Sequence, residues 1–235
     1  MLKPNNLLLN IHPDGWLFIG LFAVVTGGLG YLGEPYFFIG LVLTGWCVYF
    51  FRDPARVTPA RPGLIVAPAD GRIIAIQEVI PDSGLGLDGE TRTRISIFLN
   101  IFDVHVNRSP IDGNVVHAFY RRGKFFNASL DKASSFNERM SLALEMTGSH
   151  PYAGKKIGVV QIAGLIARRI VCTVKTGHQL RAGERFGIIR FGSRADIYLP
   201  PGLQPLVVVG QRAVAGETIL ADCMSNEAAR QGEVR

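Results

Sequence analysis

The sequence predicts a mainly β domain that follows an N-terminal helical hairpin. Residues 16–51 hold two apolar segments separated by a turn signal, and from Leu64 onward short runs rich in β-branched residues alternate with Gly, Pro and Asp. The 235 residues are enough for one domain with its own core and an appendage. A mean hydropathy of +0.22 is high for a soluble enzyme and low for a multi-span transporter. This value fits a globular body with a membrane-seeking part.

Residues 1–51 are predicted to form a membrane-associated hairpin. Its apolar segments cover residues 16–33 and 37–51, and Glu34-Pro35-Tyr36 forms the turn. Each segment is at or below the short end of the roughly 17–25 residues that span a bilayer. The hairpin therefore either crosses the membrane twice or enters one leaflet. A pair of helices buried in a protein core is the remaining alternative.

Positive charge flanks both outer ends of this hairpin. Lys3 precedes it and Arg52, Arg56 and Arg61 follow it, whereas the turn carries only Glu34. By the positive-inside rule, both ends and the body lie on the cytoplasmic face of the cell membrane. The net charge of +6 suits an anionic membrane, where each cation near the surface contributes about 1 kcal/mol. The basic residues are scattered, with no long Lys/Arg run and no known nucleic-acid module, so we expect no nucleic-acid partner.

A Pro-rich linker over residues 52–63 is expected to join the hairpin to a β-rich domain over residues 64–235. The domain has few expected helices, and the best candidate is Ala133–Met146. Residues 82–89 read as a flexible loop. The expected strands share β-branched composition and Gly, Pro or Asp at their ends. They cover residues 64–66, 71–80, 94–99, 113–120, 156–163 and 170–174.

Two separated segments of this domain resemble each other. Residues 206–221 echo residues 67–75, and together they are similar to the two halves of a lipoyl- or biotinyl-like barrel-sandwich. We therefore expect barrel-sandwich elements in the β-rich domain. No lysine stands in a carrier hairpin, which disfavours a swinging-arm carrier.

The segment Arg185–Pro200 is predicted to form two short strands with a Gly192-Ser193 step between them. After the step, apolar residues alternate with polar ones, which is typical of a half-buried strand. Gly192 permits a backbone turn that a residue with a Cβ resists. Taken alone, the Gly-Ser dipeptide indicates only a bulge or tight turn.

Seven ordered blocks give this step another meaning. They cover residues 50–56, 67–72, 102–110, 126–133, 137–139, 161–169 and 185–200. Together they resemble the phosphatidylserine decarboxylase family, in particular its short bacterial and archaeal form, whose proenzymes cut themselves at Gly-Ser. The resemblance covers most of the chain after the first few tens of residues.

The resemblance implies an enzyme that makes its own electrophile. Ser193 would attack the carbonyl of Gly192, and the chain would become a large fragment, 1–192, and a small fragment, 193–235. An ester, β-elimination and loss of ammonia would turn Ser193 into a pyruvoyl group. This group would form a Schiff base with phosphatidylserine and allow its decarboxylation to phosphatidylethanolamine and CO₂. The family requires neither a metal nor pyridoxal phosphate.

The nucleophile needs a general base and an orienting carboxylate, by the logic of Ser-His-Asp catalysis. Among five histidines, His105 matches the family's catalytic block, and Asp70 matches its carboxylate partner. Asp103 and Asp112 are local rivals for the carboxylate role. Long-form members carry a second histidine three positions before His105, where this chain has Phe102, so the role of that histidine must be met otherwise.

Other charged residues have less specific roles. Arg168, Arg169, Arg190, Arg194 and Lys132 are candidates for steering the anionic headgroup, although most such charges are simply solvated. Asn137-Glu138-Arg139 is a family block, which in isolation reads as a capped, exposed helix surface. The three cysteines are widely spaced and form no metal-ligand cluster, so they indicate a reduced, cytosolic body.

The expected partners are phosphatidylserine in an anionic membrane and the two fragments of one proenzyme, and a homo-oligomer is left open. A non-catalytic, membrane-anchored barrel-sandwich adaptor is the main alternative function. A serine hydrolase that uses Ser193 on an external ester is weaker, because the G-x-S-x-G elbow is missing.

Overall fold

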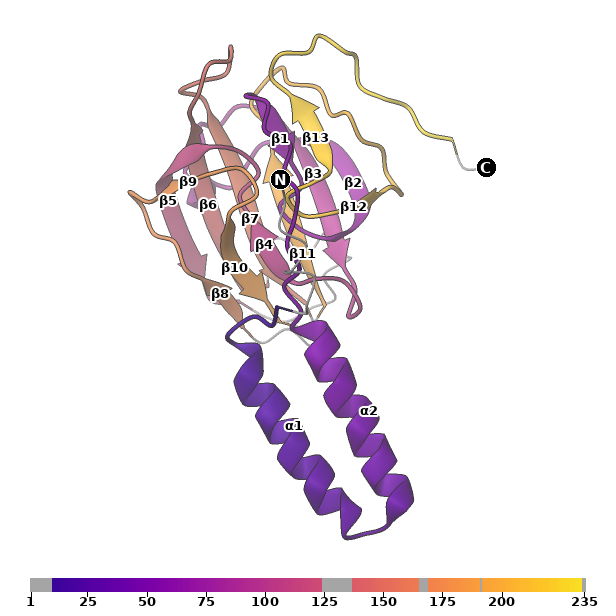
Figure 1. Cartoon of the computed structure of the whole chain (residues 1–235). Coiled ribbons are helices and arrows are strands. Elements are labelled where there is room, and N and C mark those ends of the chain that lie inside the picture. Colours follow the sequence, from indigo (N-terminus) through magenta and orange to yellow (C-terminus); the bar gives the residue numbers. More distant parts are fainter. Residues whose placement is uncertain (1–9, 124–136, 165–168, 191, 234–235) are drawn as a thin grey trace. The chain divides into compact units, whose positions relative to one another are not determined.

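The computed structural model describes residues 10–123, 137–164, 169–190 and 192–233. The chain divides into two compact units (Figure 1). One unit is Met1–Ala55 with Phe102–Val104, and the other is Arg56–Ile101 with His105–Arg235.

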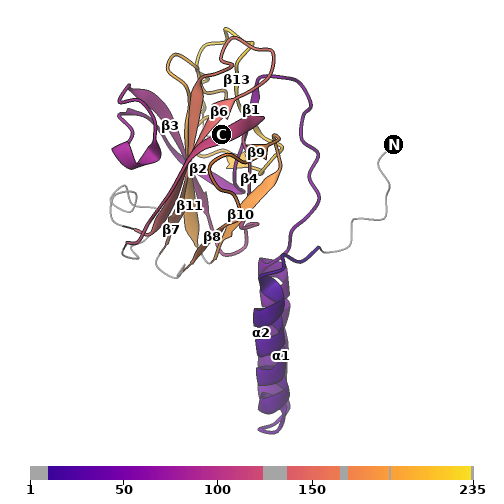
Figure 2. The same ribbon diagram turned by 90° about the vertical axis from the view of Figure 1, so that its left-hand side faces the viewer.

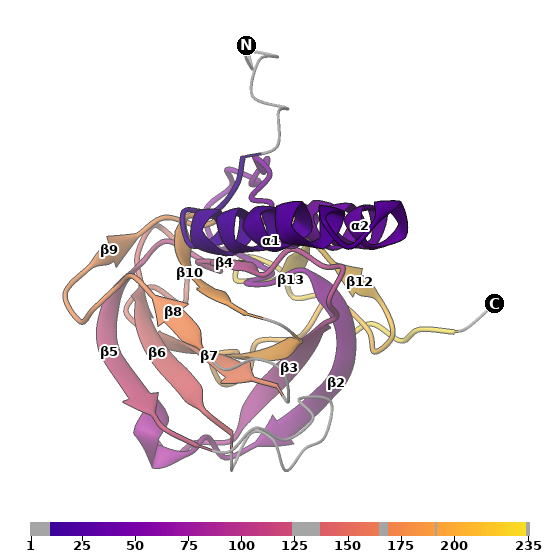
Figure 3. The same cartoon turned by 90° about the horizontal axis from the view of Figure 1, so that it is seen from below.

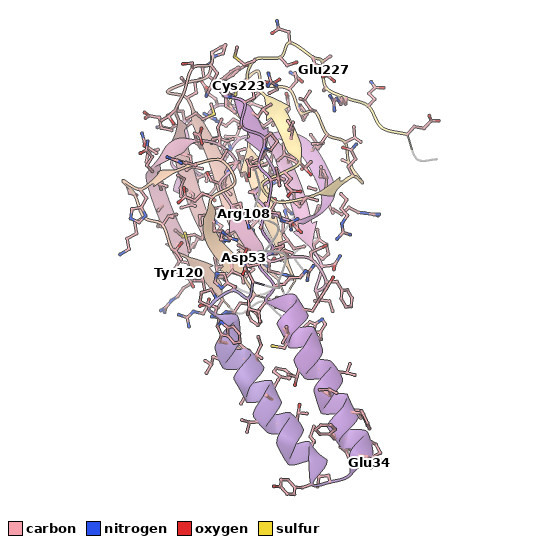
Figure 4. All side chains as sticks on the ribbon, viewed as in Figure 1. Glu34, Asp53, Arg108, Tyr120, Cys223 and Glu227 are labelled. Carbon is pink, nitrogen blue, oxygen red and sulfur yellow. The ribbon has the colours of Figure 1, made fainter. Side chains whose placement is uncertain are left out.

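The first unit is a hairpin of two antiparallel helices, α1 (Gly15–Gly30) and α2 (Glu34–Phe50) (Figures 1 and 2). The turn lies three residues earlier than predicted, because residues 34–36 already form the first turn of α2. Pro35 is tolerated there since an amide at that position has no helical acceptor. Gly33 precedes the helix with a φ of +126°, which favours glycine. Glu34 carries the only charge among residues 15–51 and lies at the turn (Figure 4).

Small and hydroxyl side chains hold the two helices together. Thr26 Oγ1 and Thr44 Oγ1 are 2.9 Å apart, and each hydroxyl also donates to a carbonyl one turn earlier in its own helix. Gly40 permits this close approach, because a Cβ there would lie 2.7 Å from Thr26 Oγ1. The hairpin is thus closed by a polar contact in an otherwise apolar segment.

Most large apolar side chains of the hairpin are exposed. They include Trp16, Leu17, Leu21, Val24, Leu32, Phe38, Ile39 and Val42, which are between 56% and 78% accessible. The alternative of two helices buried in a protein core is therefore wrong. No helix in the described part of the chain has both the length and the hydropathy needed to cross a membrane.

The second unit is built from antiparallel strands, so the mainly β prediction is confirmed. The strands are β1 (Leu64–Val66), β2 (Gly71–Val79), β3 (Arg92–Leu99), β4 (Val106–Arg108), β5 (Gly113–Arg121), β6 (Arg139–Met146), β7 (Lys156–Ala163), β8 (Ile170–Cys172), β9 (Gln179–Leu180), β10 (Arg185–Ile189), β11 (Ser193–Tyr198), β12 (Arg212–Ala213) and β13 (Ile219–Asp222). Each of the six strands predicted before residue 175 is present.

These strands form one large sheet and two small ones. The large sheet has eight strands in the order β12-β2-β3-β11-β7-β6-β5-β9 and curls into a half-barrel (Figure 3). The small sheets have the orders β4-β10-β8 and β1-β13. The main core lies on one face of the large sheet, where Ile95 and Ile97 of β3 pair with Ile197 and Ala195 of β11.

The two segments that echo each other lie side by side. Arg212 of β12 pairs with Arg72 of β2, and β1 pairs with β13. Backbone hydrogen bonds join Ala67 to both Thr218 and Gly216. The sequence echo therefore marks segments that pair in space.

The helix predicted over Ala133–Met146 is wrong for its described part. Residues 133–136 lie outside the described residues, and Arg139–Met146 form strand β6 between β5 and β7. Leu, Met, Ala and Glu have good helix propensity, which misled the prediction. Met140, Leu142 and Leu144 nevertheless alternate with period two, and this buried alternation was the strand signal.

The loop predicted over residues 82–89 is more ordered than expected. Residues Ser83–Leu85 form a short 3₁₀ helix, and Leu85 and Leu87 are buried in a second apolar cluster.

Cys223 is buried at the end of β13 (Figure 4). Burial raises the pKa of its thiol to about 11, with a further contribution from the neighbouring Asp222 carboxylate. Such a thiol is a packing group rather than a nucleophile at neutral pH.

Candidate active site

Ser193 is the first residue of the central strand β11. This strand pairs with β3 and with β7 along its whole length, from Ser193 to Tyr198. The preceding strand, β10, belongs instead to the three-stranded sheet. The Gly192–Ser193 bond therefore lies where the chain passes from one sheet to another. The two strands predicted around this step are confirmed, but they do not pair with each other.

Gly192 has the backbone conformation that the turn requires. Its φ is +58°, in the left-handed region that glycine adopts without strain. A Cβ built on Gly192 would meet no atom within 4 Å, so backbone conformation rather than lack of space explains the glycine.

The half-buried alternation predicted for β11 is wrong, because every residue from Ser193 to Tyr198 is buried. Ser193, Ala195 and Ile197 face the main core, and Arg194, Asp196 and Tyr198 face the other side of the sheet. On that side Arg194 Nε donates to Asp196 Oδ1 at 2.6 Å and Arg194 Nη2 donates to Asp196 Oδ2 at 2.8 Å. Arg194 is thus held by a buried carboxylate, which corrects the expectation that it steers a headgroup.

The Ser193 hydroxyl is in an unusual environment. The residue is 0% exposed, and its Oγ has no hydrogen-bond partner among the described residues. Most buried polar atoms in native proteins have such a partner. Ser96 of β3 is equally buried and also lacks a partner among the described residues, so what distinguishes Ser193 is that it directly follows Gly192 at the step between the two sheets.

His105 lies directly before β4 and is 0% exposed. Its carbonyl accepts a hydrogen bond of 3.2 Å from the amide of Ile189, the last residue of β10. Pairing of Val106 with Ile188 continues this contact. His105 is therefore fixed beside Ile189 at the end of β10. Ile189 is four residues before Ser193 in the chain.

Asp70 lies directly before β2 and is buried with both carboxylate oxygens engaged. Oδ2 is 2.8 Å from Arg56 Nη2, and Oδ1 accepts a 2.8 Å hydrogen bond from the amide of Ala215. Two residues earlier, the carbonyl of Pro68 accepts from the amide of Arg108 on β4, the strand that follows His105. Arg56 lies in the predicted linker and in the first of the family blocks, but nothing in its local sequence indicates this ion pair.

The rival carboxylates are placed elsewhere. Asp112 Oδ1 accepts from the amide of Ala182 at 2.7 Å, which is a turn-capping contact. Asp103 is buried in the helical unit, and Phe102 is 58% exposed.

The block Asn137-Glu138-Arg139 lies one strand away from Ser193, beside Ala163 of β7. Ala163, which pairs with Ser193, has its carbonyl bonded to Asn137 Nδ2 at 2.7 Å and its amide bonded to the carbonyl of Glu138. All three residues of the block are buried. The interpretation as an exposed helix surface is therefore wrong, and Asn137 is a site neighbour that sequence reasoning undervalued.

The other four residues predicted to steer the headgroup differ in their placement. Lys132 and Arg168 lie outside the described residues, whereas Arg169 is exposed and Arg190 is half-buried.

Comparisons with known proteins show the family of this chain. A family model described as phosphatidylserine decarboxylase matches residues 43–221. The phosphatidylserine decarboxylase proenzyme of Cereibacter sphaeroides is 54% identical over 225 residues, which cover 96% of this chain and 95% of that protein. The proenzyme of Paramagnetospirillum magneticum is 53% identical, over 96% of this chain and 92% of that protein. The proenzyme of Ruegeria pomeroyi is 56% identical, over 90% of this chain and 94% of that protein. With the family model matching most of the chain and these relatives matching nearly all of it, the chain belongs to the phosphatidylserine decarboxylase family.

Proposed function

We propose that this phosphatidylserine decarboxylase becomes active by cutting itself at the Gly192–Ser193 bond. The single observation that carries the proposal is the Ser193 hydroxyl, which is fully buried, lacks a hydrogen-bond partner among the described residues and directly follows a glycine in the left-handed conformation. The family assignment supports the same step, because the relatives are named as proenzymes. The adaptor alternative is set aside by that assignment.

The cleavage uses Ser193 as the nucleophile. Its Oγ attacks the carbonyl carbon of Gly192 and the peptide nitrogen leaves, so that an ester replaces the peptide bond. Removal of the Ser193 α-proton expels the Gly192 carboxylate from Cβ, and water then converts the resulting dehydroalanine into a pyruvoyl group with release of ammonia. The buried, unengaged position of Ser193 fits such a group. Once formed, a pyruvoyl carbonyl supplies the electron sink for loss of CO₂ from phosphatidylserine.

His105 is the proposed general base for the Ser193 hydroxyl, and Asp70 is its orienting carboxylate. The contact between His105 and Ile189 supports the first role, because it fixes the histidine beside the strand that leads to the cleavage site. The hydrogen bonds from Arg56 and Ala215 support the second, since they fix the carboxylate of Asp70.

The two subunits are proposed to stay together after cleavage. The small subunit would contain β11, β12 and β13, and these strands pair with β3 and β7, with β2 and with β1 of the large subunit. The same pairs support the finer interpretation of the fold as a barrel-sandwich with lipoyl-like elements. None of these strand pairs includes the bond between Gly192 and Ser193, so cleavage of that bond leaves the pairs in place.

The unmodified protein is expected to run as two bands on a denaturing gel and as one species under native conditions. Intact mass of the small subunit should equal residues 193–235 with a pyruvoyl group in place of the N-terminal serine. A small subunit with a free seryl amine, or a fragment that starts at another residue, would contradict the proposed chemistry.

The helical hairpin is proposed to insert into an anionic membrane on its cytoplasmic face. Its exposed apolar side chains support insertion, as does the single charge among residues 15–51, Glu34. Arg52 adjoins α2, donates to the carbonyls of Tyr49 and Phe102, and lies 3.7 Å from the centre of the Tyr49 ring. A cation and an aromatic ring in contact at a helix end are typical of the membrane interface.

We expect the paired substitutions Leu21→Glu and Val42→Glu to abolish flotation of the protein with vesicles of phosphatidylglycerol and phosphatidylcholine. Both side chains are mostly exposed, at 59% and 70%, so their substitution removes few contacts within the fold, whereas each buried charge costs about 2.5–3.5 kcal/mol in a bilayer. The matched control is Val209→Glu, because Val209 is 58% exposed on the β unit. Equal flotation of the hairpin variant and the control would rule out insertion.

A further inference from the structure

A chain of side-chain amides connects the sheet that contains Ser193 to the sheet that follows His105. Gln161 of β7 donates from Nε2 to Asn107 Oδ1 of β4 at 2.8 Å, and Asn107 donates from Nδ2 to the carbonyl of Pro68 at 3.4 Å. Gln161 is 1% exposed and Asn107 is 0% exposed. The proposed catalytic roles above do not use either residue.

The carbonyl of Pro68 determines how the side-chain amides of Asn107 and Gln161 are oriented. The carbonyl of Pro68 can only accept, so Asn107 must present its NH₂ group there. Its Oδ1 therefore faces Gln161, which in turn must present its own NH₂ group. The remaining atom is Gln161 Oε1, a buried acceptor with no hydrogen-bond partner among the described residues.

Gln161 lies on the same face of the sheet as Ser193. Gln161 pairs with Ala195, and Ser193 pairs with Ala163, so the two residues are diagonal neighbours on adjacent strands. Diagonal neighbours are within reach of a side chain as long as glutamine. The structure thus places an unsatisfied acceptor, Gln161 Oε1, and an unsatisfied hydroxyl, Ser193 Oγ, on one buried face.

The neighbouring strand leaves room for the amide bridge. A Cβ on Gly187 of β10 would lie 3.1 Å from Gln161 Nε2 and 2.3 Å from the carbonyl of Val171. A side chain at residue 187 would therefore crowd the bridge as well as the backbone.

We propose that Gln161 is a positioning residue for self-cleavage: Asn107 orients its amide so that Oε1 accepts a hydrogen bond from the hydroxyl of Ser193 as that hydroxyl turns toward the carbonyl of Gly192. The acceptor is neutral, so it orients the hydroxyl without competing with His105 for the proton. The inference rests on the proposed cleavage at Gly192–Ser193.

The test measures the rate at which newly synthesised full-length chain converts to the two fragments, followed on denaturing gels. Gln161→Met keeps the length of the side chain but removes the donor and the acceptor, and it should slow cleavage about 10- to 100-fold. The matched control is Gln211→Met, because Gln211 is exposed and its Oε1 accepts a hydrogen bond from the loop amide of Val208. The control should cleave at the unmodified rate.

Gln161→Glu separates positioning from a general loss of packing. A protonated carboxyl has an O–H donor for Asn107 and a second oxygen that accepts, so it can replace the amide in this bridge, whereas a carboxylate offers no donor to Asn107. The cleavage rate of this variant, divided by that of the unmodified protein at each pH, should fall as pH rises through the pKa of the introduced carboxyl. His105 is the titratable neighbour before β4, and Arg194 and Asp196 of β11 face the opposite side of the sheet. Dividing the variant's rate by that of the unmodified protein at the same pH removes the effect of the titration of these three groups.

Two outcomes would overturn the inference. One is cleavage of Gln161→Met at the unmodified rate, and the other is a rate ratio for Gln161→Glu that does not change with pH. If Gln161→Met fails to fold, as judged by its melting curve, the Gln161→Glu ratio decides. The mass of the small fragment from the unmodified protein, measured in the same experiment, tests the proposed function separately.

Discussion

A Ser193→Ala chain is expected to remain a single polypeptide and to form no phosphatidylethanolamine from phosphatidylserine. Without the hydroxyl there is no nucleophile for the Gly192 carbonyl and no precursor for the pyruvoyl group. Because Ser193 Oγ makes no hydrogen bond to the described residues, its removal should change the free energy of unfolding by less than about 1 kcal/mol. Denaturing gels, a lipid assay and thermal melting measure the three quantities.

Ser96→Ala is the matched control for this substitution. Ser96 is also 0% exposed, its Oγ also has no hydrogen-bond partner among the described residues, and it pairs with Asp196 on the adjacent strand. It faces the other side of the sheet, so its variant should cleave and turn over lipid normally. Turnover of phosphatidylserine by the Ser193→Ala chain would refute the proposed source of the electrophile.

His105→Gln should slow self-cleavage by about 10²- to 10⁴-fold, the usual contribution of a positioned general base. Asp70→Asn should slow it less, and should also lower the melting temperature because Arg56 then loses its carboxylate partner. Unchanged cleavage in His105→Gln would exclude this histidine as the base.

The second large effect is expected on stability, from the buried ion pair of Arg194 and Asp196. The two side chains are 1% and 0% exposed. Arg194→Met leaves the Asp196 carboxylate buried without its cation, which should destabilise the fold by about 3–5 kcal/mol. The double variant Arg194→Met with Asp196→Leu should recover most of this loss, because buried ion pairs are often replaced by apolar residues at little cost.

This experiment is best made in the Ser193→Ala background, where the chain stays intact and denaturant unfolding reports on one polypeptide. Arg230→Met is the control, since Arg230 pairs with Glu227 at the surface and such pairs contribute little. If Arg194→Met unfolds at the same denaturant concentration as its parent, the pair does not stabilise β11.

The sequence alone was sufficient wherever the signal is local. β-Branched runs bounded by Gly, Pro or Asp predicted six strands, and the apolar segments predicted the helical hairpin. The step at Gly192 was predictable because a positive φ has a residue preference of its own. Likewise, Asp70, His105 and Ser193 could be named from ordered blocks, because a motif is a local pattern of residue types.

Prediction failed where a residue's environment depends on distant strands. The sequence of β11 alternates as a half-buried strand does, but its polar face is covered because Leu85 and Leu87 pack on that side of the sheet with Tyr198, and Arg194 binds Asp196 there. β6 was predicted as a helix because its propensity is helical, and pairing with β5 and β7 overrides that preference.

By itself, the sequence determined that the chain has a helical hairpin, a β-rich body and a Gly-Ser step within a family motif. Only the tertiary structure decided that β10 and β11 belong to different sheets, that Arg56 holds Asp70, and that Gln161 reaches Asn107. The reason is physical: strand pairing and buried polar contacts join residues far apart in the chain, and neither propensity nor periodicity carries information about a partner at that distance.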